Sequence, residues 1–230
     1  MKSVNFSVTF LNHHSKNIYL RKKAITLGIS PFTSKYNKNY ISNIIDWACA
    51  NFSQVFILLA GKEAKNLLEC LGMSTIKAER KVNKEIRRQK RFCIEALSKN
   101  NYATNTIFTF SDFKNSEYYE NYSEKILKCY ESNLMFQKLC KEMSKQAMIS
   151  KAKSLSLPLD MITEKNLEYA SKYVLAELPF FLNSNPLFKT EENILAYHRD
   201  WPLGNYINKN IFSLKISQNQ GYIIIEEETS

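Results

Sequence analysis

The sequence predicts a single α/β domain with a Rossmann-like parallel sheet and helices on both faces. Short apolar, β-branched runs alternate with longer stretches of helical pattern through the first 110 residues, and such alternation is typical of parallel sheets. The chain has 230 residues, of which 44% are hydrophobic, so it is the size of one large domain with a substantial core. We therefore expect residues 1–230 to form one domain.

The expected elements follow in chain order. In the first half of the chain, we expect strands at 24–29, 55–60 and 106–110 and helices at 40–52, 62–71 and 76–98. In the second half, we expect a mostly helical stretch at 116–152, a helix at 164–181, and strands at 194–197, 211–216 and 222–226. Ligands of such sheets bind beyond the carboxyl ends of the strands. The residues that follow the expected strand at 24–29 are therefore candidates for a binding site.

Composition limits the class of protein. The five cysteines lie far apart without a Cys-x-x-Cys pair, so neither a zinc site nor a disulfide framework is expected. Their odd number and the lack of a signal-peptide pattern indicate the reducing cytoplasm. No apolar run approaches the roughly 20 residues of a membrane span. The net charge of +10 favours a polyanionic partner such as nucleic acid.

The expected helix at 76–98 carries the clearest charge pattern. At about 100° per residue, one stripe is apolar, and it consists of Ala78, Val82, Ile86, Cys93 and Leu97. The opposite arc is basic, and it consists of Lys77, Arg80, Lys84, Arg87, Arg88 and Arg91. Only Glu79 and Glu85 offset this repulsion. The arc therefore favours contact with phosphates, with a plainly solvated helix face as the alternative.

Nucleotide-binding motifs do not occur in the sequence. It has neither a G-x-x-x-x-G-K-[ST] loop nor a G-x-G-x-x-G turn, so we expect no ATP and no dinucleotide. A relay from Ser30 through His198 to Asp200 is a weak alternative. A histidine and an aspartate two residues apart on a strand point to the same side, and the chain then turns away.

Three short motifs place polar side chains beside apolar runs. GISPFTS, from Gly28, puts the Ser30 hydroxyl at the end of an expected strand, while YVLAELP, from Tyr173, puts a phenol and a carboxylate one helical turn apart. LAYH, from Leu195, ends a further apolar run in a second phenol. Considered alone, Ser30 would be a turn or cap serine and Glu177 an exposed helix residue.

Together these motifs resemble those of the cyclodipeptide synthases, bacterial enzymes that join the aminoacyl groups of two charged tRNAs into a diketopiperazine. The resemblance covers nearly the whole chain, and LLAGKEAKNLL at 58–68 is similar to the bacillary members that use leucine. It implies a fold resembling the catalytic domain of class I aminoacyl-tRNA synthetases. It also implies an enzyme that needs no metal and no other cofactor.

The resemblance implies roles for four residues. Ser30 would be the nucleophile, and a modestly activated hydroxyl can suffice because aminoacyl-tRNA is already an activated ester. Tyr197 would hydrogen-bond to Ser30 and relay protons, with a half-buried strand tyrosine as the alternative. Tyr173 and Glu177 would hold the amino group of the first residue. No Lys or Arg lies close to Glu177 in the sequence, so the substrate ammonium would match its charge, and Glu177 is also a candidate for proton transfer.

The resemblance further implies two apolar pockets around Ser30, although core packing is the alternative for each residue. The first would be lined by Thr26, Gly28, Phe110, Met143, Ser150, Tyr173 and Phe180. The second would be lined by Leu58, Ala60 and Leu195. The larger subgroup of the family has Asn, Tyr and His at three diagnostic positions, where this chain has Thr33, Tyr197 and His198. One hydroxyl cannot replace both ends of an amide, so we expect altered support of the active-site loop.

The sequence therefore predicts a cytoplasmic, monomeric synthase of cyclo(L-Leu-L-Leu) that uses leucyl-tRNA twice. The first leucyl group would acylate Ser30, the amine of the second would attack that ester, and a dipeptidyl-serine would then cyclise. The basic arc would contact tRNA. Two alternatives stay open: a non-catalytic tRNA-binding protein on a synthetase-like fold, and an enzyme that deacylates charged tRNA.

Overall fold

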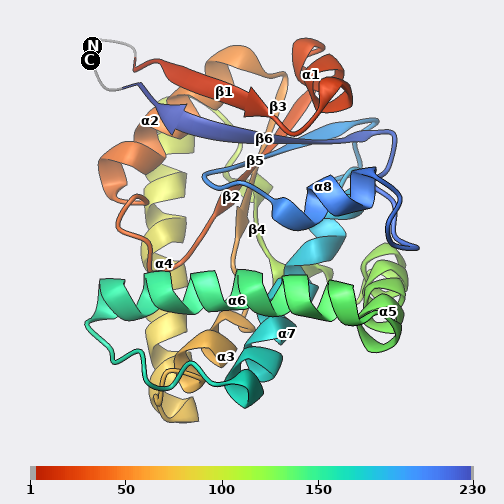
Figure 1. Cartoon of the computed structure of the whole chain (residues 1–230). Coiled ribbons are helices and arrows are strands. Elements are labelled where there is room, and N and C mark those ends of the chain that lie inside the picture. Colours follow the sequence, from red (N-terminus) through yellow and green to blue (C-terminus); the bar gives the residue numbers. More distant parts are fainter. Residues whose placement is uncertain (1–3, 229–230) are drawn as a thin grey trace.

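Residues 4–228, which the computed structural model describes, are built around one six-stranded sheet (Figure 1). The strands are β1 (Phe6–Phe10), β2 (Ala24–Ile29), β3 (Gln54–Leu59), β4 (Ile107–Thr109), β5 (Asn193–Tyr197) and β6 (Gln220–Glu227). Their order in the sheet is β1-β6-β5-β2-β3-β4. All neighbouring strands are parallel except β1, which pairs antiparallel with β6. The expected parallel sheet is therefore confirmed, with one antiparallel edge.

Helices cover both faces of the sheet (Figure 1). They are α1 (His13–Leu20), α2 (Lys38–Asn51), α3 (Ala64–Glu69), α4 (Thr75–Lys99), α5 (Glu117–Ser132), α6 (Leu134–Leu155), α7 (Glu164–Asn183) and α8 (Pro202–Asn208). One core lies between the sheet and α1, α2 and the second half of α4, while the other joins the sheet to α3, α5, α6 and α7. No helix in residues 4–228 is long and apolar enough to cross a membrane.

The central strand β2 is buried along its whole length, as expected for a strand covered by helices on both sides. Its side chains alternate between the two cores, so that Ile25, Leu27 and Ile29 face α2. Gly28 lies opposite Leu58 of β3, and Thr26 lies opposite Leu195 of β5. The strand therefore brings the residues that follow it, starting with Ser30, to the carboxyl edge of the sheet.

Several boundaries differ from expectation. The strand expected at 211–216 is wrong: this segment forms no ladder. Phe212 and Leu214 are buried by packing instead, as in the edge-to-face contact of Phe212 with Phe136 at 5.2 Å. The helical stretch expected at 116–152 is two helices that meet at Asn133, whose side chain accepts from the amide of Phe136 and caps α6. The strand β1 and the helices α1 and α8 were not expected.

Candidate active site

Ser30 lies directly beyond β2 and is 5% exposed. It lines a cavity of about 60 Å³ with residues of α6, α7, β5, β6 and the segment after β5. The lining residues are Ser30, Met143, Gln146, Ala147, Lys151, Tyr173, Val174, Glu177, Phe181, Tyr197, Arg199, Asp200, Trp201, Pro202 and Tyr222. All four residues with an expected catalytic role, Ser30, Tyr173, Glu177 and Tyr197, therefore meet at one cavity.

Tyr197 reaches Ser30 from the end of the neighbouring strand β5. A side chain at Gly28 would place its Cβ 2.8 Å from Tyr197 Cδ2, so glycine makes room for the phenol ring at this position. Burial raises the pKa of Tyr197, and the neighbouring Ser30 hydroxyl only partly opposes this rise. Tyr197 is therefore protonated at neutral pH and keeps a proton to donate.

Tyr173 and Glu177 project from one face of α7. Tyr173 is buried, and its pKa is raised by burial and then by the nearby Glu177 carboxylate. The Tyr119 hydroxyl of α5 donates to the carbonyl of Ala176 at 2.9 Å, beside Pro179 within the helix. Pro179 has no N–H to give to the Leu175 carbonyl one turn earlier, and the Tyr119 contact at the next carbonyl helps to fix the part of α7 that carries Glu177.

The surroundings of Glu177 contain two cations that sequence reasoning did not place there. Burial raises the pKa of Glu177 to about 7, against the opposing effects of Lys151 and Arg199. Lys151 is only 1% exposed, and burial, followed by Arg199, lowers its pKa to about 8. Arg199 donates to the Ser150 hydroxyl at 2.8 Å. The carboxylate therefore has protein cations near it without a substrate ammonium, and Glu177 is half-buried rather than exposed.

The residues expected in two apolar pockets are distributed differently in the structure. Six of them, from both expected pockets, line one small cavity of about 10 Å³ beside Tyr197, and they are Gly28, Leu58, Ala60, Phe110, Tyr173 and Leu195. Met143 lines the cavity of Ser30 instead. Neighbouring strands thus bring residues of both expected sets to one cavity, and their division into two substrate pockets stays a prediction.

Three expected pocket residues have other partners. The Thr26 hydroxyl accepts from Asn193 at 2.7 Å within the sheet, and Ser150 accepts from Arg199. Phe180 stacks on Phe110 with ring centroids 5.2 Å apart. These three residues line neither of the two cavities, although the partners of Ser150 and Phe180, Arg199 and Phe110, each line one of them.

His198 does not form a relay with Ser30. Its Nδ1 lies 3.0 Å from the Tyr36 hydroxyl, which donates to the carbonyl of Gly28 at 2.8 Å. Burial lowers the pKa of His198 to about 3, so the ring is neutral. Asp200 accepts instead from the amide of Trp201 at 2.9 Å. Tyr36 thus connects His198 to the backbone of β2.

Two buried polar atoms at the Ser30 loop have no hydrogen-bond partner among the described residues. Thr33 Oγ1 lies within the loop, and His198 Nε2 lies beside it. The altered support of the loop that we expect from a threonine at position 33 stays a prediction. No group of three or more His, Cys, Asp and Glu side chains in residues 4–228 could hold a metal ion.

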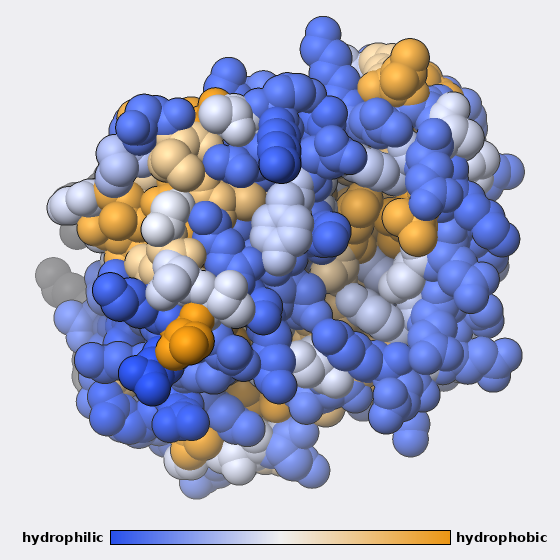
Figure 2. All heavy atoms as spheres, turned by 90° about the horizontal axis from the view of Figure 1, so that it is seen from below, coloured by the Kyte–Doolittle hydropathy of each residue, from blue (hydrophilic) through white to orange (hydrophobic). Residues whose placement is uncertain are grey.

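The expected basic arc lies on α4, and five of its six residues are exposed: Lys77, Arg80, Lys84, Arg87 and Arg91. Arg88 is half-buried because its guanidinium pairs with Glu85 at 2.6 Å. A groove of about 650 Å³ runs beside this face, and its lining comprises Phe32, Lys81, Lys84, Glu85, Arg87, Arg88, Arg91 and Leu155. Seen from below, the molecule is mostly hydrophilic around a hollow with hydrophobic residues at its floor (Figure 2).

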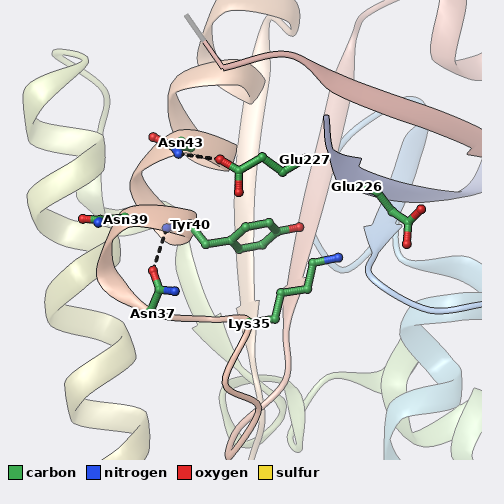
Figure 3. A pocket seen from close by; sticks show the side chains of 7 residues that line it. All are labelled: Lys35, Asn37, Asn39, Tyr40, Asn43, Glu226 and Glu227. Carbon is green, nitrogen blue, oxygen red and sulfur yellow. Dashed lines mark hydrogen bonds between the residues drawn. The ribbon is translucent and has the colours of Figure 1, made fainter. Parts of the chain in front are cut away.

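Another hollow, of about 530 Å³, lies beside the start of α2 (Figure 3). Two hydrogen bonds join its lining residues: Asn37 accepts from the amide of Tyr40 at 3.0 Å, and Asn43 donates to Glu227 at 2.8 Å. None of the residues with an expected role lines it. These contacts cap α2 and attach it to β6.

Comparisons with known proteins place the fold and then the family. A Mycobacterium tuberculosis protein superposes on this chain with a TM-score of 0.84 at 20% identity, over 99% of this chain and 96% of that one. Its structure was described as showing that cyclodipeptide synthetases are related to type I tRNA-synthetases. This likeness defines a synthetase-related α/β fold.

The family model for cyclodipeptide synthases matches residues 6–227. The chain is 52% identical over 225 residues to the cyclo(L-leucyl-L-leucyl) synthase of Staphylococcus haemolyticus, covering 97% of this chain and 96% of that protein. It is 40% identical over 226 residues to the Bacillus subtilis enzyme of the same name, covering 98% and 91%. A cyclodipeptide synthase from Bacillus thermoamylovorans superposes with a TM-score of 0.95 at 50% identity, over 97% of each chain. The chain belongs to the cyclodipeptide synthase family, whose enzymes use aminoacyl-tRNAs.

Proposed function

We propose that this chain makes cyclo(L-Leu-L-Leu) from two leucyl-tRNAs through acyl groups carried on Ser30. The observation that carries the proposal is the meeting of Ser30, Tyr173, Glu177 and Tyr197 at one cavity. The apolar lining of the adjoining cavity by Leu58, Leu195 and other side chains supports a hydrophobic aminoacyl group. The names of the two curated relatives support leucine in particular.

The first step is an exchange of esters. Ser30 Oγ attacks the carbonyl carbon of leucyl-tRNA, the bond from that carbon to the ribose oxygen breaks, and the serine proton ends on the ribose hydroxyl. Tyr197, which is protonated and lines the same cavity as Ser30, relays this proton. No external energy source is required because one ester replaces another.

The amine of leucyl-Ser30 must be the attacking group, not the amine of the second leucyl-tRNA as expected from the sequence. If the second amine attacked the Ser30 ester, the serine would be released and the dipeptide would remain on tRNA. A dipeptidyl-serine forms only if the amine of leucyl-Ser30 attacks the second leucyl-tRNA ester and expels that tRNA. The new terminal amine then attacks the Ser30 ester, closes the six-membered ring and returns the serine hydroxyl.

Glu177 is suited to proton transfer during these attacks. Its pKa of about 7 lies near neutral pH, where a group can both accept and return a proton. The carboxylate accepts a proton from the ammonium of leucyl-Ser30, and the attacking nitrogen loses its second proton to the departing ribose oxygen. Tyr173, one turn away on α7, holds the same amine.

Intact-protein mass spectrometry of the enzyme mixed with leucyl-tRNA tests the proposal, together with product analysis. The wild type should show a leucyl adduct and release cyclo(Leu-Leu). Ser30→Ala should show neither, whereas Ser30→Cys should leave a thioester that can be trapped. Ser34→Ala, at an exposed serine of the same segment, is the matched control and should behave as wild type.

Each alternative has its own result. An adduct on Ser30→Ala would disprove the nucleophile, and a different cyclodipeptide would disprove the choice of leucine. Release of free leucine alone would identify a deacylase. Binding of tRNA without turnover would identify a non-catalytic binding protein.

A further inference from the structure

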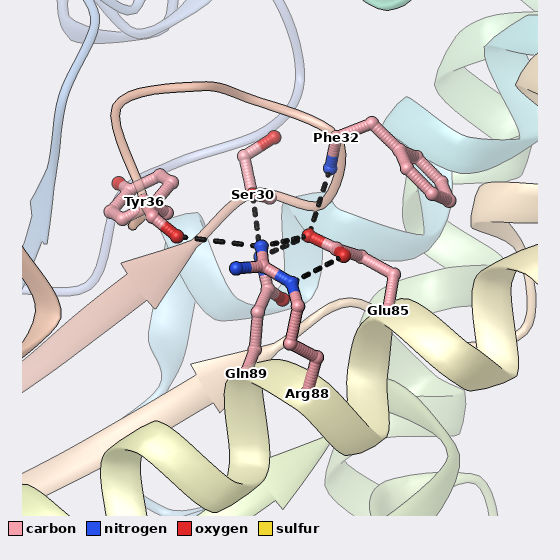
Figure 4. A network of polar contacts seen from close by, with 6 residues as sticks. All are labelled: Ser30, Phe32, Tyr36, Glu85, Arg88 and Gln89. Atoms are coloured by element: carbon pink, nitrogen blue, oxygen red, sulfur yellow. Dashed lines mark hydrogen bonds and ion pairs between the residues drawn. The ribbon is translucent and has the colours of Figure 1, made fainter. Parts of the chain in front are cut away.

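Three residues of α4 hold the backbone of the segment that carries Ser30 (Figure 4). Gln89 Nε2 donates to the Ser30 carbonyl at 3.0 Å, and Glu85 accepts from the Phe32 amide at 3.4 Å. Arg88 donates to the Tyr36 carbonyl at 3.5 Å. Positions 85, 88 and 89 share one face of a helix. We call Glu85, Arg88 and Gln89 the loop clamp.

The members of the loop clamp are bonded to one another. Glu85 accepts from Gln89 Nε2 at 3.2 Å and from Arg88 at 2.6 and 2.8 Å. Gln89 is fully buried and the Glu85 side chain is 12% exposed. Because buried polar groups depend on each other for hydrogen bonds, a change at one member alters the others.

The segment held by the clamp is strained. Phe32 has a φ of +56°, a left-handed conformation that a residue with a Cβ adopts only when its surroundings enforce it. Thr33 Oγ1, the next hydroxyl along, is buried without a partner. Within the segment, the Tyr36 amide donates to the Thr33 carbonyl at 3.1 Å, and the clamp adds bonds to the backbone of Ser30, Phe32 and Tyr36 that help to enforce this conformation.

The loop clamp also borders the basic groove. Phe32, Glu85 and Arg88 line this groove together with Lys84, Arg87 and other basic residues. A phosphodiester in the groove would approach Arg88, which fits phosphate as well as carboxylate. Any such contact would change how strongly Arg88 holds Glu85, and Glu85 in turn contacts the Ser30 segment.

We propose that Glu85 and Gln89 are positioning residues for Ser30, and that Arg88 is shared between Glu85 and a phosphate of the bound tRNA. Binding of tRNA to α4 thereby affects the position of Ser30, because the loop clamp that contacts both lies within one helical turn. This inference rests on the proposed function, because it concerns the rate at which leucyl-tRNA acylates Ser30.

Single-turnover acylation of Ser30 at increasing leucyl-tRNA concentration separates positioning from binding. Gln89→Met keeps a side chain of similar size without the amide. It should lower the limiting acylation rate about tenfold, the scale of one hydrogen bond, with the half-saturating tRNA concentration within about twofold of wild type. Lys90→Ala, at an exposed lysine of α4 outside the groove and the clamp, is the matched control and should change neither quantity.

Two further variants examine the groove and the shared arginine. The double variant Arg87→Ala, Arg91→Ala should raise the half-saturating concentration more than it lowers the limiting rate. Its slope of log affinity against log salt should also become shallower, by about 0.7 to 0.9 for each phosphate that the variant no longer neutralises. Arg88→Lys, which lacks the guanidinium fork, should change both the half-saturating concentration and the limiting rate.

The outcomes distinguish the two proposals. If the wild type forms no leucyl adduct, the proposed function fails and the clamp inference fails with it. If the wild type is acylated and Gln89→Met has the same limiting rate, only the clamp inference is overturned. A rate that falls only in proportion to the folded fraction, measured by circular dichroism, would also overturn it. If Gln89→Met does not fold, Glu85→Gln, which keeps the side-chain shape, provides the same test.

Discussion

Replacing Lys151 by methionine should stabilise the fold while damaging the site. Burial, then Arg199, lowers the pKa of Lys151 from its ordinary 10.5 to about 8, so the folded state disfavours the charged lysine. At 1.36 kcal/mol per pKa unit, this shift corresponds to about 3 kcal/mol. Methionine has a similar volume and no charge, so Lys151→Met should unfold with a free energy about 2 to 3 kcal/mol higher near pH 6.5.

The pH dependence gives this prediction its sign. The charged Lys151 destabilises the fold fully below its folded pKa of about 8. The destabilisation disappears as the pH rises towards the unfolded pKa of 10.5, because the lysine is then neutral in both states. The advantage of Lys151→Met should therefore shrink between pH 8 and 10.5. Urea unfolding at pH 6.5, 8 and 10.5 measures it, with Lys153→Met, at an exposed lysine of α6, expected within about 0.5 kcal/mol of wild type throughout.

Two outcomes would refute this reasoning. If Lys151→Met is less stable than wild type at pH 6.5, the ammonium is held favourably and its burial is not a cost. If the advantage persists unchanged at pH 10.5, its origin is packing and not charge. Loss of a cation near Glu177 should also raise the pKa of that carboxyl, and the rate of cyclodipeptide formation should shift to higher pH.

The remaining predictions concern substitutions at Glu177, Tyr173 and Thr33. Glu177→Gln should reduce the rate of cyclodipeptide formation by about one to two decades, as expected for removal of a charge-assisted bond of about 1.5 to 3 kcal/mol. Tyr173→Phe should raise the activation free energy by less, about 0.5 to 1.5 kcal/mol. The double variant should lose less activity than the sum of the two single effects. Because the pKa of Glu177 is raised to about 7, the wild type should lose stability from about pH 4.5 upwards through pH 7, whereas Glu177→Gln should not. Near-wild-type turnover of Glu177→Gln would contradict a role at the amine. Thr33→Asn offers an amide where a buried hydroxyl has no partner, so its melting temperature should rise by about 2 to 4 °C, for about 1 kcal/mol; a lower value would show that the space does not admit the larger side chain.

The sequence predicted best the elements whose pattern is unambiguous. Residues 24–29 form a strand with the expected bounds because a fully apolar β-branched run is typical of a strand buried on both faces. Residues 211–216 also contain apolar side chains, but Phe212 and Leu214 are buried by side-chain packing without a ladder. The edge strand β1 (Phe6–Phe10) alternates between buried and exposed side chains. Its pairing partner β6 (Gln220–Glu227) lies at the far end of the chain, which no local pattern reveals.

The polar residues missed at the site carried a local signal. In α6, the buried residues Cys140, Ser144, Met148 and Lys151 recur at intervals of three or four, so Lys151 lies on an inward stripe and not among solvated lysines. In α4, Gln89 likewise lies on the buried stripe, together with Val82 and Cys93. A charged or amide side chain on the buried face of an amphipathic helix needs a polar partner, and in both helices that partner lies near Ser30. What the sequence could not supply is the identity of the partner, because the Glu177 carboxylate that favours the Lys151 ammonium and the Ser30 carbonyl that accepts from Gln89 come from distant segments.

The two cations beside Glu177 change how this carboxyl can act. Without them, a buried carboxylate would depend on the substrate ammonium for its charge, and removing that proton during catalysis would leave the carboxylate unmatched. With Lys151 and Arg199 opposing the effect of burial, the pKa of Glu177 is about 7, so its charged and neutral forms have similar free energies near neutral pH. Glu177 can therefore take a proton from the amine and return it at little cost. This balance requires a buried lysine that the fold alone would be more stable without.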